Sequence, residues 1–140
     1  MASDSTNSFT ARWRVRSYEL DSNGHVNNSV YLAYAEEIAT LHAEALGFGR
    51  TWTTARGAAW VVRKHAITYH RPALYGQDLE LTTTVLGMRG ARGVRRTSIA
   101  LVSGTPLADI ETEWVWVRAS DGRPMRVPEE LTRAFAYNSD

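Results

Sequence analysis

The sequence predicts an α+β fold, with a five-stranded antiparallel sheet wrapped around one long helix. A strand-like segment of period two comes first, and a single long segment of helical period follows it. Four further strand-like segments then succeed one another with short turns between them. Because consecutive strands joined by short turns pair antiparallel, we expect one sheet with the helix lying across it.

Apolar residues recur at every second position in the first predicted strand: Phe9, Ala11, Trp13 and Val15. In the predicted helix they recur at spacings of three and four: Tyr31, Tyr34, Ile38, Leu41 and Ala45. We expect Asn27 or Asn28 as its N-cap residue and Gly47 at its C-cap. Turn residues fill the segment between these two elements.

The rest of the chain is rich in β-branched and aromatic residues, interrupted by turn signals. The remaining expected strands are 58–69, 79–88, 94–102 and 107–118. Residues 50–57 are expected to form a loop, and Pro128 is expected to open a short helix. Residues 1–8 and 137–140 are expected to be flexible ends of a single domain covering 1–140.

One helix is about 10 Å across, whereas five strands span roughly 24 Å. The helix therefore covers the middle of one sheet face, and no helix remains for the other face. We expect a second subunit to bury part of the remaining surface, so the sequence predicts a homodimer or a homotetramer.

Composition limits the classes of function. The 140 residues hold 16 basic and 15 acidic side chains, so the chain is almost neutral overall. Its total charge therefore does not indicate nucleic acid or a membrane surface as a partner. The absence of cysteine excludes a disulfide, a thiolate metal site and a cysteine nucleophile. The first residues lack the pattern of a signal peptide, so we expect a cytoplasmic protein.

The segment before the helix holds the residues suited to catalysis. Asp21, Asn23 and His25 lie at alternate positions just ahead of the predicted helix start. Unpaired N–H groups there, around 26–28, can polarise a thioester carbonyl, while a carboxylate attacks it or takes a proton from water. Turn formation and helix capping alone would use the same residue types, so the pattern allows both interpretations.

The run from Asp21 to Glu37, DSNGHVNNSVYLAYAEE, resembles the signature of the 4-hydroxybenzoyl-CoA thioesterase family of hotdog proteins. It is similar also to the D-x-N-x-H-V-N-N motif of acyl-acyl-carrier-protein thioesterases. Tyr69-His-Arg-Pro-Ala73 and Gly76-Gln-Asp-Leu79 resemble further family motifs in the same order. The resemblance covers nearly the whole domain.

The resemblance implies a hotdog fold, hydrolysis of an acyl thioester on coenzyme A or a carrier protein, no metal or other cofactor, and active sites at dimer interfaces. It implies that Asp21 is the catalytic acid, with Asn23 and His25 as its partners. The plant-type enzymes also have a glutamate on the second strand, where this chain has Thr68 or Tyr69. Water activation can then rest on Asp21 alone.

Further residues are candidates for binding the substrate. Val26, Asn27 and Asn28 can offer main-chain N–H groups, and Tyr31 can donate from its hydroxyl or belong to the core. Four arginines around a predicted hairpin turn could hold the phosphates of coenzyme A or an acidic carrier protein, or form a solvated turn: Arg89, Arg92, Arg95 and Arg96.

His65 and His70 are five residues apart in or beside one strand, a spacing that does not chelate one ion, so no metal site is predicted. Two other functions compete with hydrolysis. A hotdog hydratase or dehydratase typically has D-x-N-P-x-H, which this chain lacks, and a non-catalytic module would bind an acyl thioester without turnover. The sequence leaves open the acyl group, coenzyme A against carrier protein, and a nucleophilic against a general-base role for Asp21.

Overall fold

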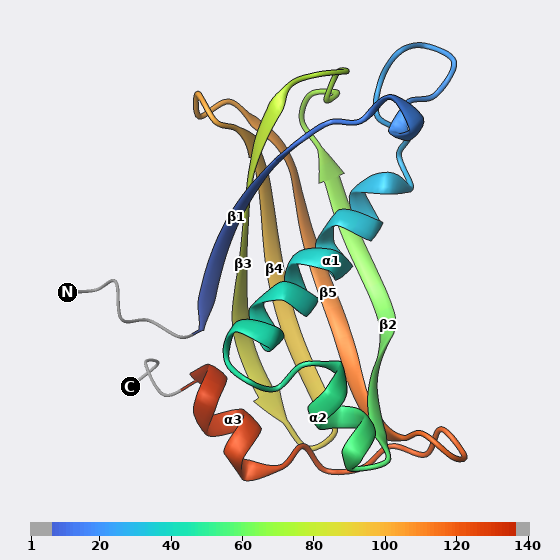
Figure 1. Cartoon of the computed structure of the whole chain (residues 1–140), viewed down its shortest axis with the longest axis vertical. Coiled ribbons are helices and arrows are strands. Elements are labelled where there is room, and N and C mark those ends of the chain that lie inside the picture. The colour runs from blue at the N-terminus through green and yellow to red at the C-terminus, as the bar shows by residue number, and fades with distance from the viewer. Residues whose placement is uncertain (1–6, 137–140) are drawn as a thin grey trace, which may run out of the picture.

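In the computed structural model, which describes residues 7–136, a five-stranded antiparallel sheet is crossed by one long helix (Figure 1). The predicted fold class is therefore confirmed. The elements follow in this order: β1 (Ser8–Arg14), the 3-10 helix η2 (Ser17–Glu19), α1 (Val30–Ala45), α2 (Arg50–Ala55), β2 (Ala58–Tyr69), β3 (Asp78–Arg89), β4 (Arg92–Leu101), β5 (Pro106–Arg118) and α3 (Glu129–Ala136).

Several sequence-based boundaries differ from the structure by one or two residues, and two segments differ in kind. Residues 50–55 form the helix α2 rather than a loop. Ser8 belongs to β1 and lies opposite Thr84 of β3, so the structured part begins earlier than expected. The expected flexible ends otherwise lie in 1–6 and 137–140, outside the described residues.

The strand order in the sheet is β1-β3-β4-β5-β2. The consecutive strands β2 and β3 are therefore not neighbours, because β2 pairs with β5 at the edge opposite to β1. Between β1 and β2 the chain runs through α1 and α2, which carry it from one sheet edge to the other (Figure 1). The sheet is not closed, and β1 and β2 are its two edges.

The start of α1 differs from the prediction. Ser29 is the N-cap residue and its side chain makes no capping hydrogen bond. The Asn27 Oδ1 atom instead accepts hydrogen bonds from both the main-chain N–H and the hydroxyl of Ser29, each at 2.9 Å. At the other end Gly47 has φ 88°, the left-handed conformation that favours glycine after a helix, as predicted.

The helix crosses the sheet diagonally, so its two halves contribute to different apolar clusters (Figure 1). One cluster packs the start of α1 against the middle of the sheet, with Tyr31, Tyr34 and Ile38 at its centre. The other lies between α3 and the ends of the strands, around Trp116 and Phe135.

The second cluster explains why 50–55 are helical. Trp52 contacts the rings of Phe48 and Trp116 at 4.8 and 6.0 Å between centroids. The segment RTWTTA holds three threonines, which have modest helix propensity. Tertiary packing of Trp52 stabilises this turn of helix, and no local sequence signal announces that packing.

The outer face of the sheet, away from α1, is polar. Cross-strand ion pairs lie on it, among them Arg12–Glu80 at 3.1 Å, Arg14–Asp78 at 3.0 Å and Arg92–Glu113 at 2.6 Å. Such a face is stable in water without a covering layer. The polar character of this face gives no separate reason for a covering subunit, so the expected oligomer stays a prediction.

Glu19 is a buried carboxylate that links the segment around the 3-10 helix η2 to α1. It accepts hydrogen bonds from the Arg16 main-chain N–H at 2.9 Å and from the Arg16 guanidinium at 3.0 Å. The Tyr34 hydroxyl of α1 donates to it at 2.7 Å. Burial, and then this hydrogen bond, raise the pKa of Tyr34 far above its ordinary value, so the hydroxyl remains a donor.

We expect Tyr34→Phe to lower the free energy of unfolding by about 1–3 kcal/mol, because one buried carboxylate oxygen loses its hydroxyl donor. Urea denaturation followed by circular dichroism measures the change. Tyr18→Phe is the control, because Tyr18 is 81% exposed. Equal stability of the two variants would contradict the role given to the Tyr34–Glu19 hydrogen bond.

Candidate active site

The loop from Asp21 to Asn28 lies at one end of the sheet and leads into α1 (Figure 1). It is held on two sides. His25 forms an isolated bridge with Leu74, and the Val26 N–H donates to the Ala73 carbonyl at 2.9 Å. On the other side the Asn27 N–H donates to the Glu19 carbonyl at 2.8 Å, so the loop has a defined conformation.

Asp21 is partly buried, and its two carboxylate oxygens have different roles. The Oδ1 atom accepts hydrogen bonds from the main-chain N–H groups of Asn23 at 2.8 Å and His25 at 3.2 Å. The Oδ2 atom has no hydrogen-bond partner among residues 7–136. The same side chain thus shapes the loop, as the capping interpretation expects, and keeps one oxygen free for chemistry.

The main-chain donors near the helix start are not equivalent. Those of Val26 and Asn27 are already used by Ala73 and Glu19. Within the described part of the chain, the Asn28 N–H donates to no group. Of the three predicted donors, the structure therefore leaves Asn28 available to a substrate oxygen.

The side chains of Asn23 and His25 are exposed and make no hydrogen bond to another described residue. Both are therefore accessible to solvent in the single chain.

Tyr31 is buried in the core, and its hydroxyl accepts a hydrogen bond from the Ala73 N–H at 2.9 Å. Burial, above all, raises the pKa of this hydroxyl, and the charge of the nearby Asp21 adds to the effect. Of the two expected roles, the structure favours the core role and not a substrate contact.

Tyr69 contacts the candidate site, a role that was not predicted from the sequence. Its hydroxyl donates to the Asn28 carbonyl at 2.9 Å, and its ring lies edge-on to Tyr31. It therefore supports the peptide group next to the free N–H of Asn28. Its place in the motif Tyr-His-Arg-Pro-Ala was visible, but the contact joins residues 41 positions apart.

The four arginines separate into two groups. Arg89, Arg92 and Arg96 are exposed, and Arg92 forms an ion pair with Glu113. Arg95 points to the inner face and exposes only 8% of its surface, so the expectation that it lies at a solvated turn is wrong. Alternation along β4 puts neighbouring side chains on opposite faces, which the cluster in the sequence concealed.

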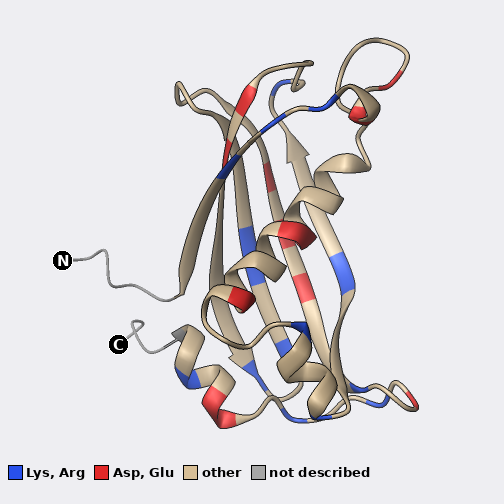
Figure 2. Cartoon of the chain, viewed as in Figure 1, with Lys and Arg blue, Asp and Glu red and all other residues tan. Residues whose placement is uncertain are grey.

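The turn between β3 and β4 also lies at the opposite end of the sheet from Asp21. Lys and Arg are frequent at that end (Figure 2). The 12 residues of β3 span about 40 Å. These arginines therefore do not reach the Asp21 loop of their own chain.

The two strand histidines have separate partners. The His65 Nε2 atom lies 3.2 Å from Glu36 and its Nδ1 atom 2.8 Å from Thr112. His70 lies beside Asp109 at 2.8 Å. Among the described residues no group of three side chains could hold a metal ion. None of the helices described is both long and apolar enough to cross a membrane.

The fold and the site together define a class. An antiparallel sheet of five strands around one long helix is the hotdog arrangement, and the loop that leads into the helix holds an acidic residue and an unpaired N–H. Residues 15–135 match the family model of the thioesterase-like superfamily, and the chain belongs to that family. The family resemblance noted in the sequence is confirmed.

Particular relatives agree with this assignment. The chain is 30% identical over 126 residues to the acyl-CoA thioester hydrolase YbgC of Escherichia coli O6:H1, covering 89% of this chain and 94% of that protein. It is 26% identical over 125 residues to ATL3, a chloroplastic acyl-acyl carrier protein thioesterase of Arabidopsis thaliana, covering 89% and 65%.

The fold also matches that of Slr0204, a 1,4-dihydroxy-2-naphthoyl-CoA thioesterase from Synechocystis. The TM-score is 0.85 at 18% identity, with 95% of this chain and 98% of the other covered. At this identity the likeness concerns the fold alone.

Proposed function

We propose that this chain hydrolyses an acyl thioester, releasing a carboxylic acid and a thiol. The observation that carries the proposal is that one ordered loop before α1 holds both a free carboxylate oxygen, on Asp21, and a free N–H, on Asn28. An N–H at a helix start is well suited to a carbonyl oxygen that gains negative charge during attack.

Asp21 can act in two ways, and atoms and charges are conserved in both. As a nucleophile, its Oδ2 attacks the thioester carbon and expels the thiolate, which takes a proton, and water then hydrolyses the mixed anhydride. As a general base, Oδ2 takes a proton from water while the resulting hydroxide attacks the carbon, and the tetrahedral intermediate then breaks its C–S bond to expel the thiolate, which takes a proton. In both routes the Asn28 N–H stabilises the oxyanion.

Asn23 and His25 complete the site in this proposal. Their side chains are exposed on the same loop, and their main-chain N–H groups hold the Asp21 Oδ1 atom. The amide of Asn23 would orient the attacking water. The imidazole of His25 would orient the thioester and supply the proton that the leaving thiolate takes.

The thiol carrier is coenzyme A or an acyl carrier protein, the two carriers named in the relatives YbgC and ATL3. In both, the reactive thioester has the same chemistry, so the proposed site accommodates either. We further propose a cytoplasmic enzyme that needs no metal or other cofactor.

We also propose that two chains form the active unit. Within residues 7–136, β2 is a long edge strand paired only with β5, and Val61 on it is 45% exposed. Joining two β2 strands antiparallel about a two-fold axis would continue the sheet across both chains. A homotetramer would add a second kind of contact to this dimer.

This dimer would also give the arginine turn a role. In an antiparallel pair, the β3–β4 end of one protomer lies beside the Asp21 end of its partner. Arg89, Arg92 and Arg96 could then bind the phosphates of the partner's coenzyme A, or an acidic carrier protein.

We expect Asp21→Asn to reduce kcat by at least about 100-fold while leaving the loop intact, because an asparagine Oδ1 can still accept both N–H groups that Asp21 holds. Thiol release from a panel of acyl-CoAs and acyl carrier proteins measures turnover. Ser22→Ala, on the exposed neighbouring residue, is the matched control. Full activity in the Asp21 variant would rule out the proposed mechanism.

We expect the chain to sediment as a dimer or a larger oligomer built from it, and Val61→Lys to shift it to monomer, because an edge lysine opposes strand pairing. Analytical ultracentrifugation measures both. Leu86→Lys, on an exposed residue of the interior strand β3, is the control. A monomeric wild type with full turnover would contradict the proposed dimer.

A further inference from the structure

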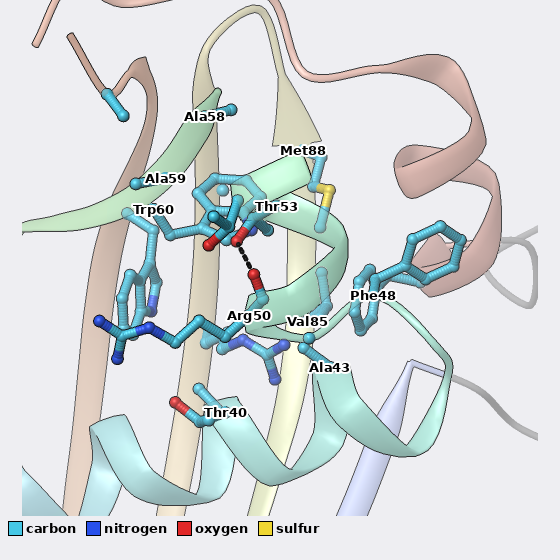
Figure 3. Close-up of a pocket in the computed structure, with 18 of the residues that line it drawn as sticks. Thr40, Ala43, Phe48, Arg50, Thr53, Ala58, Ala59, Trp60, Val85 and Met88 are labelled. Atoms are coloured by element: carbon cyan, nitrogen blue, oxygen red, sulfur yellow. Dashed lines mark hydrogen bonds between the residues drawn. The ribbon is translucent and has the colours of Figure 1, made fainter. Parts of the chain in front are cut away.

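A second site lies at the other end of α1. A cavity of about 440 Å³ opens between the C-terminal half of α1, α2 and the strands beneath them (Figure 3). The volume lies within the range of small-molecule sites. Ala39 is the first residue of α1 that lines it, 11 positions beyond Asn28, or about 16 Å along a helix.

Small side chains keep this cavity open. Ala43 of α1 and Ala58 of β2 line it, and Gly93 of β4 leaves room for the Trp60 ring, which a Cβ atom would approach to 3.4 Å. Larger apolar side chains form the walls, including Trp60, Met88 and Phe48 (Figure 3). The lining therefore favours an apolar ligand.

Arg95 also lines the cavity, and it is a buried cation with no carboxylate partner in the described part of the chain. Its Nη1 atom donates to the His42 Nδ1 atom at 2.9 Å and to the Thr83 hydroxyl at 3.1 Å. Both partners are acceptors without negative charge. Its Nε and Nη2 atoms donate to no residue in the described part of the chain.

Buried charges in proteins are normally paired with an opposite charge, because removing a lone ion from water is costly. Burial lowers the pKa of Arg95 to about 10, and no acidic residue between 7 and 136 counteracts this shift. The guanidinium remains charged at neutral pH. Its unused N–H groups are thus available to an anion entering the cavity.

Trp114 supplies a second unused donor. Its indole N–H is buried and has no acceptor among residues 7–136, and its ring lines the same cavity. On the sheet, Gly93 lies opposite Trp114 and Arg95 lies opposite Thr112. Arg95 and Trp114 are therefore diagonal neighbours on the inner face. Two neighbouring donors without an acceptor among the described residues would suit a ligand that carries oxygen atoms.

We infer that this cavity binds an apolar carboxylic acid, with its carboxylate at Arg95 and Trp114 and its hydrocarbon part against Trp60 and Met88. Arg50 and Thr40 also line the cavity, and the charge of Arg50 would attract the anion (Figure 3). The contact between Glu36 and His65 lies between this cavity and the Asp21 end of α1. The site is therefore distinct from the proposed catalytic loop and does not depend on hydrolysis there.

The test is calorimetric titration of the full-length protein with octanoate and with octanamide, which has the same chain but no charge. We expect one octanoate per chain and an affinity at least about tenfold above that of octanamide, as charge-assisted hydrogen bonds require. Octanoate should also raise Tm, because it binds the folded chain.

Two variants locate the site. Arg95→Met should reduce octanoate affinity at least about tenfold and leave the weak binding of octanamide unchanged. Its Tm without ligand should equal or exceed that of the wild type, because an apolar side chain replaces a buried unpaired cation. Ala43→Phe should block both ligands by filling the cavity. These two variants keep the test decisive if either one folds poorly.

Two controls separate this site from others. Arg96→Met removes the neighbouring arginine on the outer face and should bind octanoate like the wild type. Asp21→Asn should also bind it normally, which would exclude product bound in the catalytic loop. The inference is overturned if the wild type does not bind octanoate, if octanamide binds equally well, or if Arg95→Met retains full affinity.

Discussion

The structure depends on one geometric constraint, namely that a single long helix has to cover an antiparallel sheet of five strands. The sheet is more than twice as wide as a helix, which is about 10 Å across. The diagonal course of α1 brings its first half over one part of the sheet and leaves the start of β2 and the end of β5 to other elements (Figure 1). The helices α2 and α3 close that region with an aromatic cluster. The cavity lies where small residues prevent these layers from closing completely.

The same constraint exposes the start of α1 at the end of the sheet. A helix start has unpaired donors, and the buried carboxylate of Glu19 fixes its position by joining Arg16 and Tyr34. The main-chain carbonyl of Glu19 also holds Asn27. Stability and the proposed chemistry are therefore linked, because the interactions that order the loop also consume all but one of the donors between Val26 and Asn28. The Asp21 carboxylate combines the same two roles, because its Oδ1 atom orders the loop and its Oδ2 atom has no partner among the described residues.

The sequence neighbours of Arg95 suggest a position for it that differs from its position in the fold. Beside Arg96 and near Arg92 it resembles part of a solvated basic turn. In the fold it lies among His42, Thr83 and Phe135, the last at 5.3 Å from the guanidinium to the ring centre. A buried cation with neutral partners is unfavourable unless an anion joins it. An apolar carboxylate in the adjacent cavity would supply that anion, and it belongs to the same chemical class as the acid released by the proposed reaction.

Local sequence patterns were sufficient to predict much of the structure of this protein. The period of two in β1, the helical spacing from Tyr31 to Ala45 and the motif from Asp21 to Asn28 depend on near neighbours, and they predicted the fold class, the family and the candidate loop. Contacts between distant residues decided the rest. The strand order, the helix at 50–55, the Tyr69 contact with Asn28 and the burial of Arg95 all depend on which segments meet across the sheet. Because side-chain burial and hydrogen-bond partners are set by that packing, the sequence by itself determined which groups are present, and only the tertiary structure decided which of them remain free to act.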